Sequence, residues 1–190
     1  MSTTFATETP MTAASSAGSV RKDTAICGAI FAGASMMWFG WGQQGGEIGG
    51  LLVAGSLVAI TVTVLAALNI RRTPGRPTLS VDPRARGIYW GAVLAEVIAI
   101  VGSAALLNRA GHPAYLSSVT LAIVGLHFLP MMRAFRIRLL GAVAMACVLI
   151  GGAAAGGGLL GWWPAPTAAG LGGGLALLVA GVGCILGSRR

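Results

Sequence analysis

Long apolar runs separated by short polar breaks dominate this sequence. A helix crosses the hydrocarbon core of a bilayer, about 30 Å thick, in about 20 residues, because each helical residue rises about 1.5 Å. The breaks carry Gln, Gly, Pro, Asn and Arg, which are typical of turns and interfaces. The pattern predicts six transmembrane helices, near residues 24 to 42, 48 to 70, 88 to 107, 115 to 132, 139 to 160 and 167 to 187.

The composition supports helices as the spanning structure. Hydrophobic residues make up 55% of the chain and charged residues only 9%. Inside lipid every backbone amide must be satisfied, and only helices or closed barrels achieve this. Barrel strands would alternate polar and apolar residues, and these runs do not alternate. The expected class is therefore all-α, a polytopic membrane helix bundle.

The first 20 residues differ from the rest of the chain. They are rich in Ser, Thr and Ala and show no helical or strand period. We expect residues 1–20 to be a disordered cytoplasmic tail, followed by a six-span transmembrane domain over residues 21–190. They do not resemble a signal peptide, since the basic pair Arg21 and Lys22 follows the polar segment and does not precede it.

Lysine and arginine are distributed with a strong bias, which predicts the orientation. Short loops rich in these residues stay on the cytoplasmic side. With the N-terminus inside, only Arg109 falls outside; the other twelve of the thirteen basic residues fall inside, namely Arg21, Lys22, Arg71, Arg72, Arg76, Arg84, Arg86, Arg133, Arg136, Arg138, Arg189 and Arg190. We expect both ends in the cytoplasm. This bias accounts for the net charge of +8 without a nucleic-acid partner, and membrane lipids are the expected surroundings.

Two glycine pairs suggest how helices pack. Gly152 and Gly156 are four residues apart in the fifth predicted span, as are Gly170 and Gly174 in the sixth. This spacing lets helix backbones approach closely, so the two spans are candidates to pack together. A chain with 30 glycines also produces such pairs by chance.

Glu96 and His127 are ionisable residues inside predicted spans, where an unpaired charge costs about 3 kcal/mol or more. Their spans are joined by a short turn, residues 108 to 113, and should form an antiparallel hairpin. Reflecting position 96 through the turn centre reaches Gly125, so His127 lies about 3 Å further along the axis. The two side chains are therefore expected within reach of each other.

Such a pair has coupled protonation and is suited to a proton relay. Pro130 donates no backbone hydrogen bond, which leaves the Leu126 carbonyl without its helical partner and favours a kink beside His127. Glu96, His127 and Pro130 together form the candidate polar site. The alternative is structural: a protonated Glu96 and a neutral His127 would each bond a neighbouring helix and set its register.

We expect no metal ion and no cofactor. His112 belongs to an outer turn and His127 to the inner side of its span, so one subunit cannot bring both to one metal. Hydrolase, phosphate-loop and dinucleotide motifs are missing from the sequence. We therefore do not expect an enzyme, and the alternative is an intramembrane enzyme built on Glu96 or His127.

The segment from Arg86 to Gly141, above all Val124-Gly125-Leu126-His127-Phe128-Leu129-Pro130, resembles an uncharacterised group of bacterial multipass membrane proteins with a GLHFLP-type segment. The resemblance implies a bacterial inner membrane and a joint role for His127 and Pro130, and it implies no activity. Two functions remain open from the sequence. One is a small permease-like protein with a protonatable Glu/His site. The other is a non-catalytic subunit or scaffold that binds a second copy or another membrane protein through its glycine-rich faces.

Overall fold

The computed structural model describes residues 10–46 and 48–189, which form helices joined by short turns. No strand is present in this part of the chain. Six of the helices are long and apolar enough to cross a membrane. The predicted all-α class and the number of spans are therefore confirmed. Each predicted apolar run lies almost entirely within one helix.

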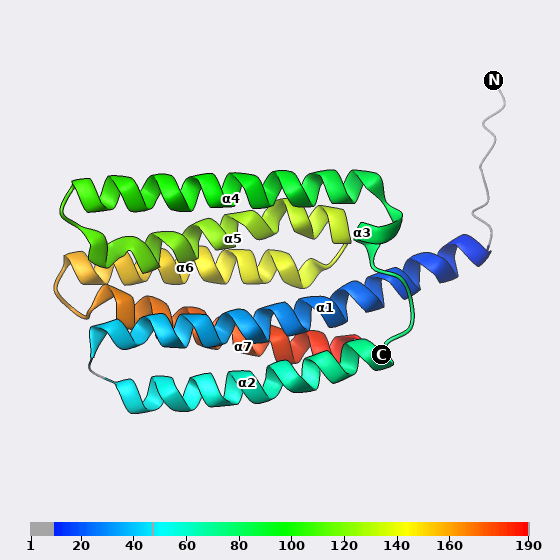
Figure 1. Cartoon of the computed structure of the whole chain (residues 1–190), viewed down its shortest axis with the longest axis horizontal. Helices are drawn as coiled ribbons and strands as arrows, with labels where there is room; N and C mark the ends of the chain where they lie inside the picture. Colours follow the sequence, from blue (N-terminus) through cyan, green and yellow to red (C-terminus); the bar gives the residue numbers. More distant parts are fainter. Residues whose placement is uncertain (1–9, 47, 190) are drawn as a thin grey trace, which may run out of the picture.

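The helices follow one another with short connections (Figure 1). Two are single turns of 3-10 helix, η1 and η2, and α3 is a four-residue helix between the second and third spans. The bounds are α1 (Pro10–Gly42), η1 (Gln43–Gly45), α2 (Gly49–Arg72), α3 (Thr78–Val81), α4 (Pro83–Arg109), η2 (Pro113–Tyr115), α5 (Leu116–Phe135), α6 (Arg138–Leu159) and α7 (Ala165–Gly187).

Helix α1 begins earlier than the sequence pattern suggests. Residues 10–20, predicted as part of a disordered tail, are helical, while residues 1–9 of that tail lie outside the described part of the chain. Pro10 is tolerated in a first turn, where its missing N–H would have no partner. The apolar part of α1 packs in the bundle, and adding turns to an existing helix costs little compared with nucleating one. Apolar periodicity cannot reveal such an extension, because residues 10 to 20 show no helical period of apolar positions in the sequence.

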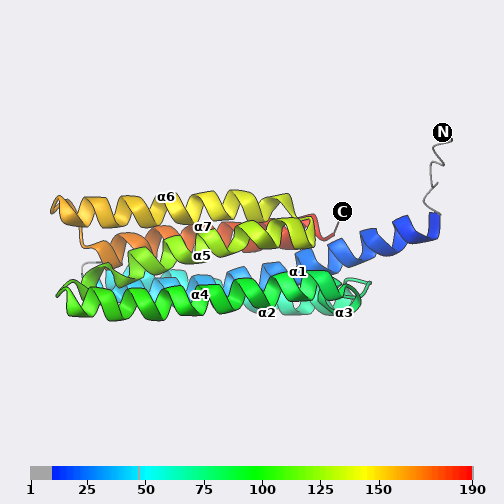
Figure 2. The same cartoon turned by 90° about the horizontal axis from the view of Figure 1, so that it is seen from above.

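The six long helices run side by side in one bundle (Figure 1). Seen from above, α6 lies on one side of the bundle and α4 and α2 lie on the other, with α5 and α7 between them (Figure 2). The core forms where α1, α5, α6 and α7 meet and includes the buried side chains Phe31, Trp38, Leu121, Leu140 and Leu177. Helix α4 is peripheral: of its residues only Ala85 is buried, and its main neighbour is α5.

Basic residues gather at one end of the bundle, which we call the basic end. There α2, α5 and α7 finish and α4 and α6 begin (Figure 1, right-hand side). Arg21 of α1, Arg72 of α2 and Arg189, two residues after the end of α7, line one hollow there. Lys22 of α1 ties this end together, since its Nζ donates to the carbonyls of Ile70, at 2.7 Å, and Thr73, at 3.0 Å. Arg109 lies at the opposite end of the bundle.

Gly170 and Gly174 make close helix contacts, as their spacing predicts, but with α1 and not with α6; Gly152 and Gly156 make none. A Cβ at Gly170 would collide with the backbone of Gly42 and Trp38, and one at Gly174 would collide with Phe39, so both glycines pack against α1. Nothing lies near the Cβ position of Gly152 or Gly156. Helix α6 buries a different face, which contains Gly151, Ala154 and Gly157. Its sequence offers glycines on more than one face, so their spacing alone cannot say which face is covered.

Candidate functional site

The structure brings Glu96 and His127 together. Glu96 lies on α4 and His127 on α5, and His127 Nδ1 is 3.2 Å from Glu96 Oε2. Both groups are shielded: 8% of the His127 side chain and 19% of the Glu96 side chain is exposed. The two side chains are at ion-pair distance from each other. This contact joins two residues of adjacent spans, as the hairpin register predicts.

The turn between α4 and α5 sets this register. Gly111 adopts a left-handed φ of 76°, and the amides of Gly111 and His112 donate to the carbonyls of Asn108 and Leu107. This arrangement closes the C-terminal end of α4 in the way that a left-handed glycine allows. The single turn η2 then leads directly into α5. Because both helices rise equally per residue, a tight turn determines which positions lie opposite each other.

The contact has the distance of an ion pair but not the alignment of a hydrogen bond. His127 Nδ1 is buried and has no hydrogen-bond partner among the described residues, because the ring N–H does not point along a hydrogen-bonding direction toward Oε2. A carboxylate and an imidazole this close are within range for sharing one proton.

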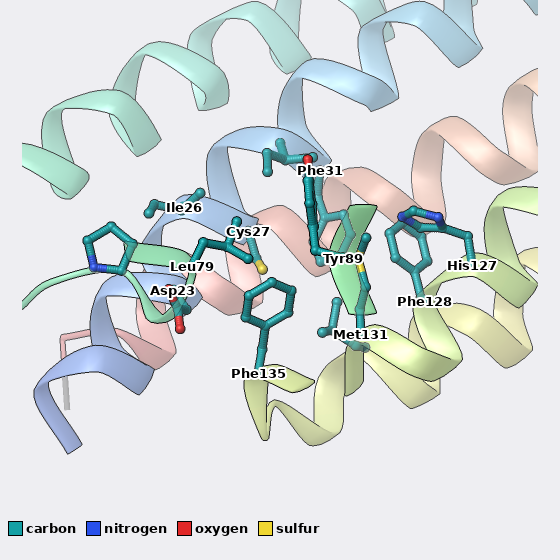
Figure 3. A pocket seen from close by; sticks show the side chains of 13 residues that line it. Asp23, Ile26, Cys27, Phe31, Leu79, Tyr89, His127, Phe128, Met131 and Phe135 are labelled. Atoms are coloured by element: carbon teal, nitrogen blue, oxygen red, sulfur yellow. The ribbon is translucent and has the colours of Figure 1, made fainter. Parts of the chain in front are cut away.

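His127 borders two separate cavities. The first, of about 240 Å³, is lined mainly by α1 and α5, with single residues from α3, α4 and α6, and we call it the α1–α5 cavity. Figure 3 shows His127 at one end of this cavity and Asp23 at the other. The second, of about 250 Å³, lies between α4 and α5 and is lined by Glu96, Leu126, His127 and Pro130 among others; we call it the α4–α5 cavity.

Pro130 lies where the sequence reasoning expects it. It is inside α5, which continues from Leu116 to Phe135, and it lines the α4–α5 cavity beside Glu96 and His127. The proline supplies no N–H to the Leu126 carbonyl, and Leu126 lines the same cavity. The Glu96 carboxyl, the His127 imidazole and Leu126 thus come from two helices to one cavity. The kink at this point stays a prediction.

Asp23 is a functional candidate that the sequence reasoning missed. It lies on α1, is 4% exposed, and accepts the Thr78 amide at 3.0 Å from Oδ1 and 3.3 Å from Oδ2. This contact holds the start of α3 against α1. In the sequence Asp23 follows Arg21 and Lys22 and looks like one more charge at the edge of a span. The available signal was an acidic residue directly before an apolar run, in a chain with few acids.

The described residues contain no group of three or more His, Cys, Asp and Glu side chains that could hold a metal ion. Cys147 and Cys184 are buried in the core, and Cys27 is partly buried beside the α1–α5 cavity. His112 lies in the exposed turn before η2, and its ring is 6.1 Å from that of Tyr115. These groups take no part in the Glu96 and His127 site.

In comparisons with known proteins, no family model, no curated protein and no solved structure matches this chain. The resemblance of the GLHFLP-type segment to bacterial multipass proteins stays a prediction. What the fold establishes is the general class, a helical membrane protein with six spans.

Proposed function

We propose that this protein is a small permease in which the Glu96–His127 pair takes up and releases a proton. The observation that carries the proposal is the position of His127, whose Nδ1 lies 3.2 Å from Glu96 Oε2 while its ring borders both cavities. A permeant in either cavity would therefore lie next to a group that changes charge. Ionisable residues inside membrane spans mark ion and proton pathways more often than other residues do.

The chemistry of the pair explains how a proton would matter. With His127 neutral and Glu96 ionised the pair carries one negative charge, and one added proton makes it neutral overall. A net charge inside the membrane is costly, so protonation changes which arrangement of α4 and α5 is favoured. Pro130, three residues from His127, leaves α5 without one backbone hydrogen bond at this level, where a small rearrangement is least opposed.

The same proposal places the protein in a bacterial inner membrane with both ends in the cytoplasm. The clustering of arginines at the basic end supports this orientation, because basic short loops stay on the cytoplasmic side. It assigns no enzymatic reaction to the chain.

Proton flux into liposomes tests the permease function. Purified protein is reconstituted with a pH-sensitive dye inside, and a potassium diffusion potential made with valinomycin drives protons inward. We expect flux above that of protein-free liposomes, and at least a tenfold loss in Glu96→Gln and in His127→Ala. His112→Ala is the matched control, since His112 is exposed and far from the pair. Circular dichroism checks that each variant is folded.

Two outcomes would overturn the proposal. One is the absence of wild-type flux. The other is flux that persists unchanged in folded Glu96→Gln and His127→Ala proteins. In either case the pair serves to hold α4 against α5.

A scaffold role is the second candidate, favoured by the uncovered glycines of α6. Gly152 is exposed and neither Gly152 nor Gly156 has a neighbour at its Cβ position, so another small-residue helix could approach there. If a second copy binds this face, Gly152→Leu and Gly156→Leu should convert a detergent-solubilised dimer to a monomer in light scattering. Gly102→Leu on α4, also without neighbours, should leave the mass unchanged. A wild-type monomer would contradict self-association through this face.

A further inference from the structure

We propose that the α1–α5 cavity binds a small lipophilic cation, with Asp23 as its counter-charge. The inference rests on the proposed function, because it names the class of permeant for the same site. The class follows from the charge, the aromatic lining and the location of the cavity.

The charge of the cavity favours a cation. The titratable side chains that line it are Asp23 and Cys27 from α1, Tyr89 from α4 and His127 from α5, while α3 and α6 contribute only apolar side chains. No lysine or arginine lines it. An anionic ligand would therefore meet a buried carboxylate and no fixed positive charge. A buried carboxylate is costly without a positive partner, and a bound cation would be that partner.

Asp23 has capacity left to bind such a cation. The hydrogen bonds that it receives among the described residues come from Thr78, and no Lys or Arg of that part of the chain is within ion-pair distance of it. A carboxylate has about four acceptor sites, so those bonds do not saturate it. The neighbouring Lys22 ammonium is directed elsewhere, to the end of α2.

The aromatic lining suits an organic cation more than a hydrated metal ion. Two edge-to-face pairs border the cavity: Phe31 with Phe128, at 5.3 Å between ring centroids, and Tyr89 with Phe135, at 6.4 Å. Cations are attracted to ring faces within about 6 Å, and quaternary ammonium groups are recognised in this way. The remaining lining, such as Met131 and Leu140, is apolar and offers little to replace the hydration shell of a small metal ion.

The location of the cavity explains why the cation should be lipophilic. Ile30, at the cavity, is 55% exposed on a spanning helix, so the cavity borders on the surface that faces lipid. An amphiphilic cation dissolved in the bilayer could enter beside α1 without crossing the polar loops. Asp23 at the basic end and His127 deeper in the span would then lie at opposite ends of the bound molecule (Figure 3).

Binding is tested in micelles with benzyltrimethylammonium and with its uncharged isostere neopentylbenzene. The local readout is the methyl resonance of Met131 in protein labelled with [¹³C-methyl]methionine, assigned with Met131→Leu. We expect saturable binding of the cation by the wild type. Asp23→Asn, which keeps an oxygen to accept the Thr78 amide, should weaken cation binding at least tenfold and leave neopentylbenzene unaffected. Asp82→Asn is the control, because Asp82 also accepts backbone amides but lies outside the cavity.

Three results would overturn this assignment: no saturable binding of the cation to the wild type, equal binding by folded Asp23→Asn, or equal weakening by Asp82→Asn. Without ligand, a Met131 resonance at the same position in Asp23→Asn and in the wild type shows that the substitution leaves the cavity intact. Binding is measured without a gradient, so it is independent of flux. If the cation binds at Asp23 but flux is unchanged in Glu96→Gln and His127→Ala, only the permease proposal is refuted. If flux depends on Glu96 and His127 but the cation does not bind, only the cation proposal is refuted.

Discussion

Single residues decide where the helices of this bundle approach each other most closely. Gly170 of α7 lies against the backbone of Gly42 of α1, and Gly181 of α7 lies against Ala32 and Gly28 of α1. At these points the absence of a side chain is what allows contact. On α6, Gly152 has open space around its Cβ position, so the same residue type has no packing role there within the chain.

Gly170→Ala is therefore expected to destabilise the folded protein by about 1–3 kcal/mol, the usual cost of overpacking a close contact. The added methyl would meet the backbone of Gly42 and the Trp38 carbonyl, which cannot move aside as a flexible side chain can. The measurement is unfolding by SDS titration in mixed micelles. Gly152→Ala, four or more ångströms from any neighbour at the added atom, should be neutral or slightly stabilising. Equal stability of the two variants would contradict this account of the α1 and α7 contact.

At the scale of elements, polar contacts tie the ends of neighbouring helices together. Asp82 begins α4 by accepting the amides of Arg84 and Ala85, at 2.8 and 3.2 Å. Asn69 of α2 donates to Ser188 after α7 at 2.8 Å. Lys22 of α1 donates to the carbonyls of Ile70, in the last turn of α2, and of Thr73, directly after it, where the helix dipole is negative. These bonds lie at the basic end and complement the apolar packing further along the bundle.

Lys22→Met is expected to cost about 1.5–3 kcal/mol, the range for a hydrogen bond that involves a charged group. The substitution keeps most of the length of the side chain and removes the ammonium that bonds the Ile70 and Thr73 carbonyls. Amide hydrogen exchange should locate the loosened segment at the end of α2, with unfolding curves giving the size of the loss. Arg71→Met, which removes an exposed cation from the same end, should cost less than about 0.5 kcal/mol. A larger loss for Arg71→Met would show that net charge, and not this contact, is what matters.

At the scale of the whole molecule, the bundle has one basic end and one end with Arg109. Six spans return the chain to the side from which it started, so both termini share that side. The charge difference between the ends predicts which side is the cytoplasm.

Reporter fusions in bacterial cells check this orientation. Alkaline phosphatase, which is active only outside the cytoplasm, should be active when fused after Gly111, between α4 and α5. Green fluorescent protein, which fluoresces inside, should do so when fused after Arg76, between α2 and α3. Exchanging the two reporters supplies the control, since each should then be inactive. An active phosphatase after Arg76 would reverse the predicted orientation.

The sequence by itself determined the class, the number of spans and the meeting of Glu96 with His127. These features depend on local quantities: the length of an apolar run, the rise of a helix and the shortness of the turn at Gly111. A pair on two successive helices joined by a tight turn has only one axial offset open to it. For this reason two residues 31 positions apart, 96 and 127, could be placed together without a structure.

Only the tertiary structure decided which helix faces are buried and which residues share a cavity with His127. Asp23 and His127 border one cavity although they belong to α1 and α5, and no turn connects these helices directly. Gly170 and Gly174 of α7 pack on α1, the first helix of the chain, and not on α6, as their spacing had suggested. Contacts between helices that are distant in sequence depend on the shapes of all the packed surfaces at once. A helix that is hydrophobic on every side does not reveal in its sequence which side faces protein and which faces lipid.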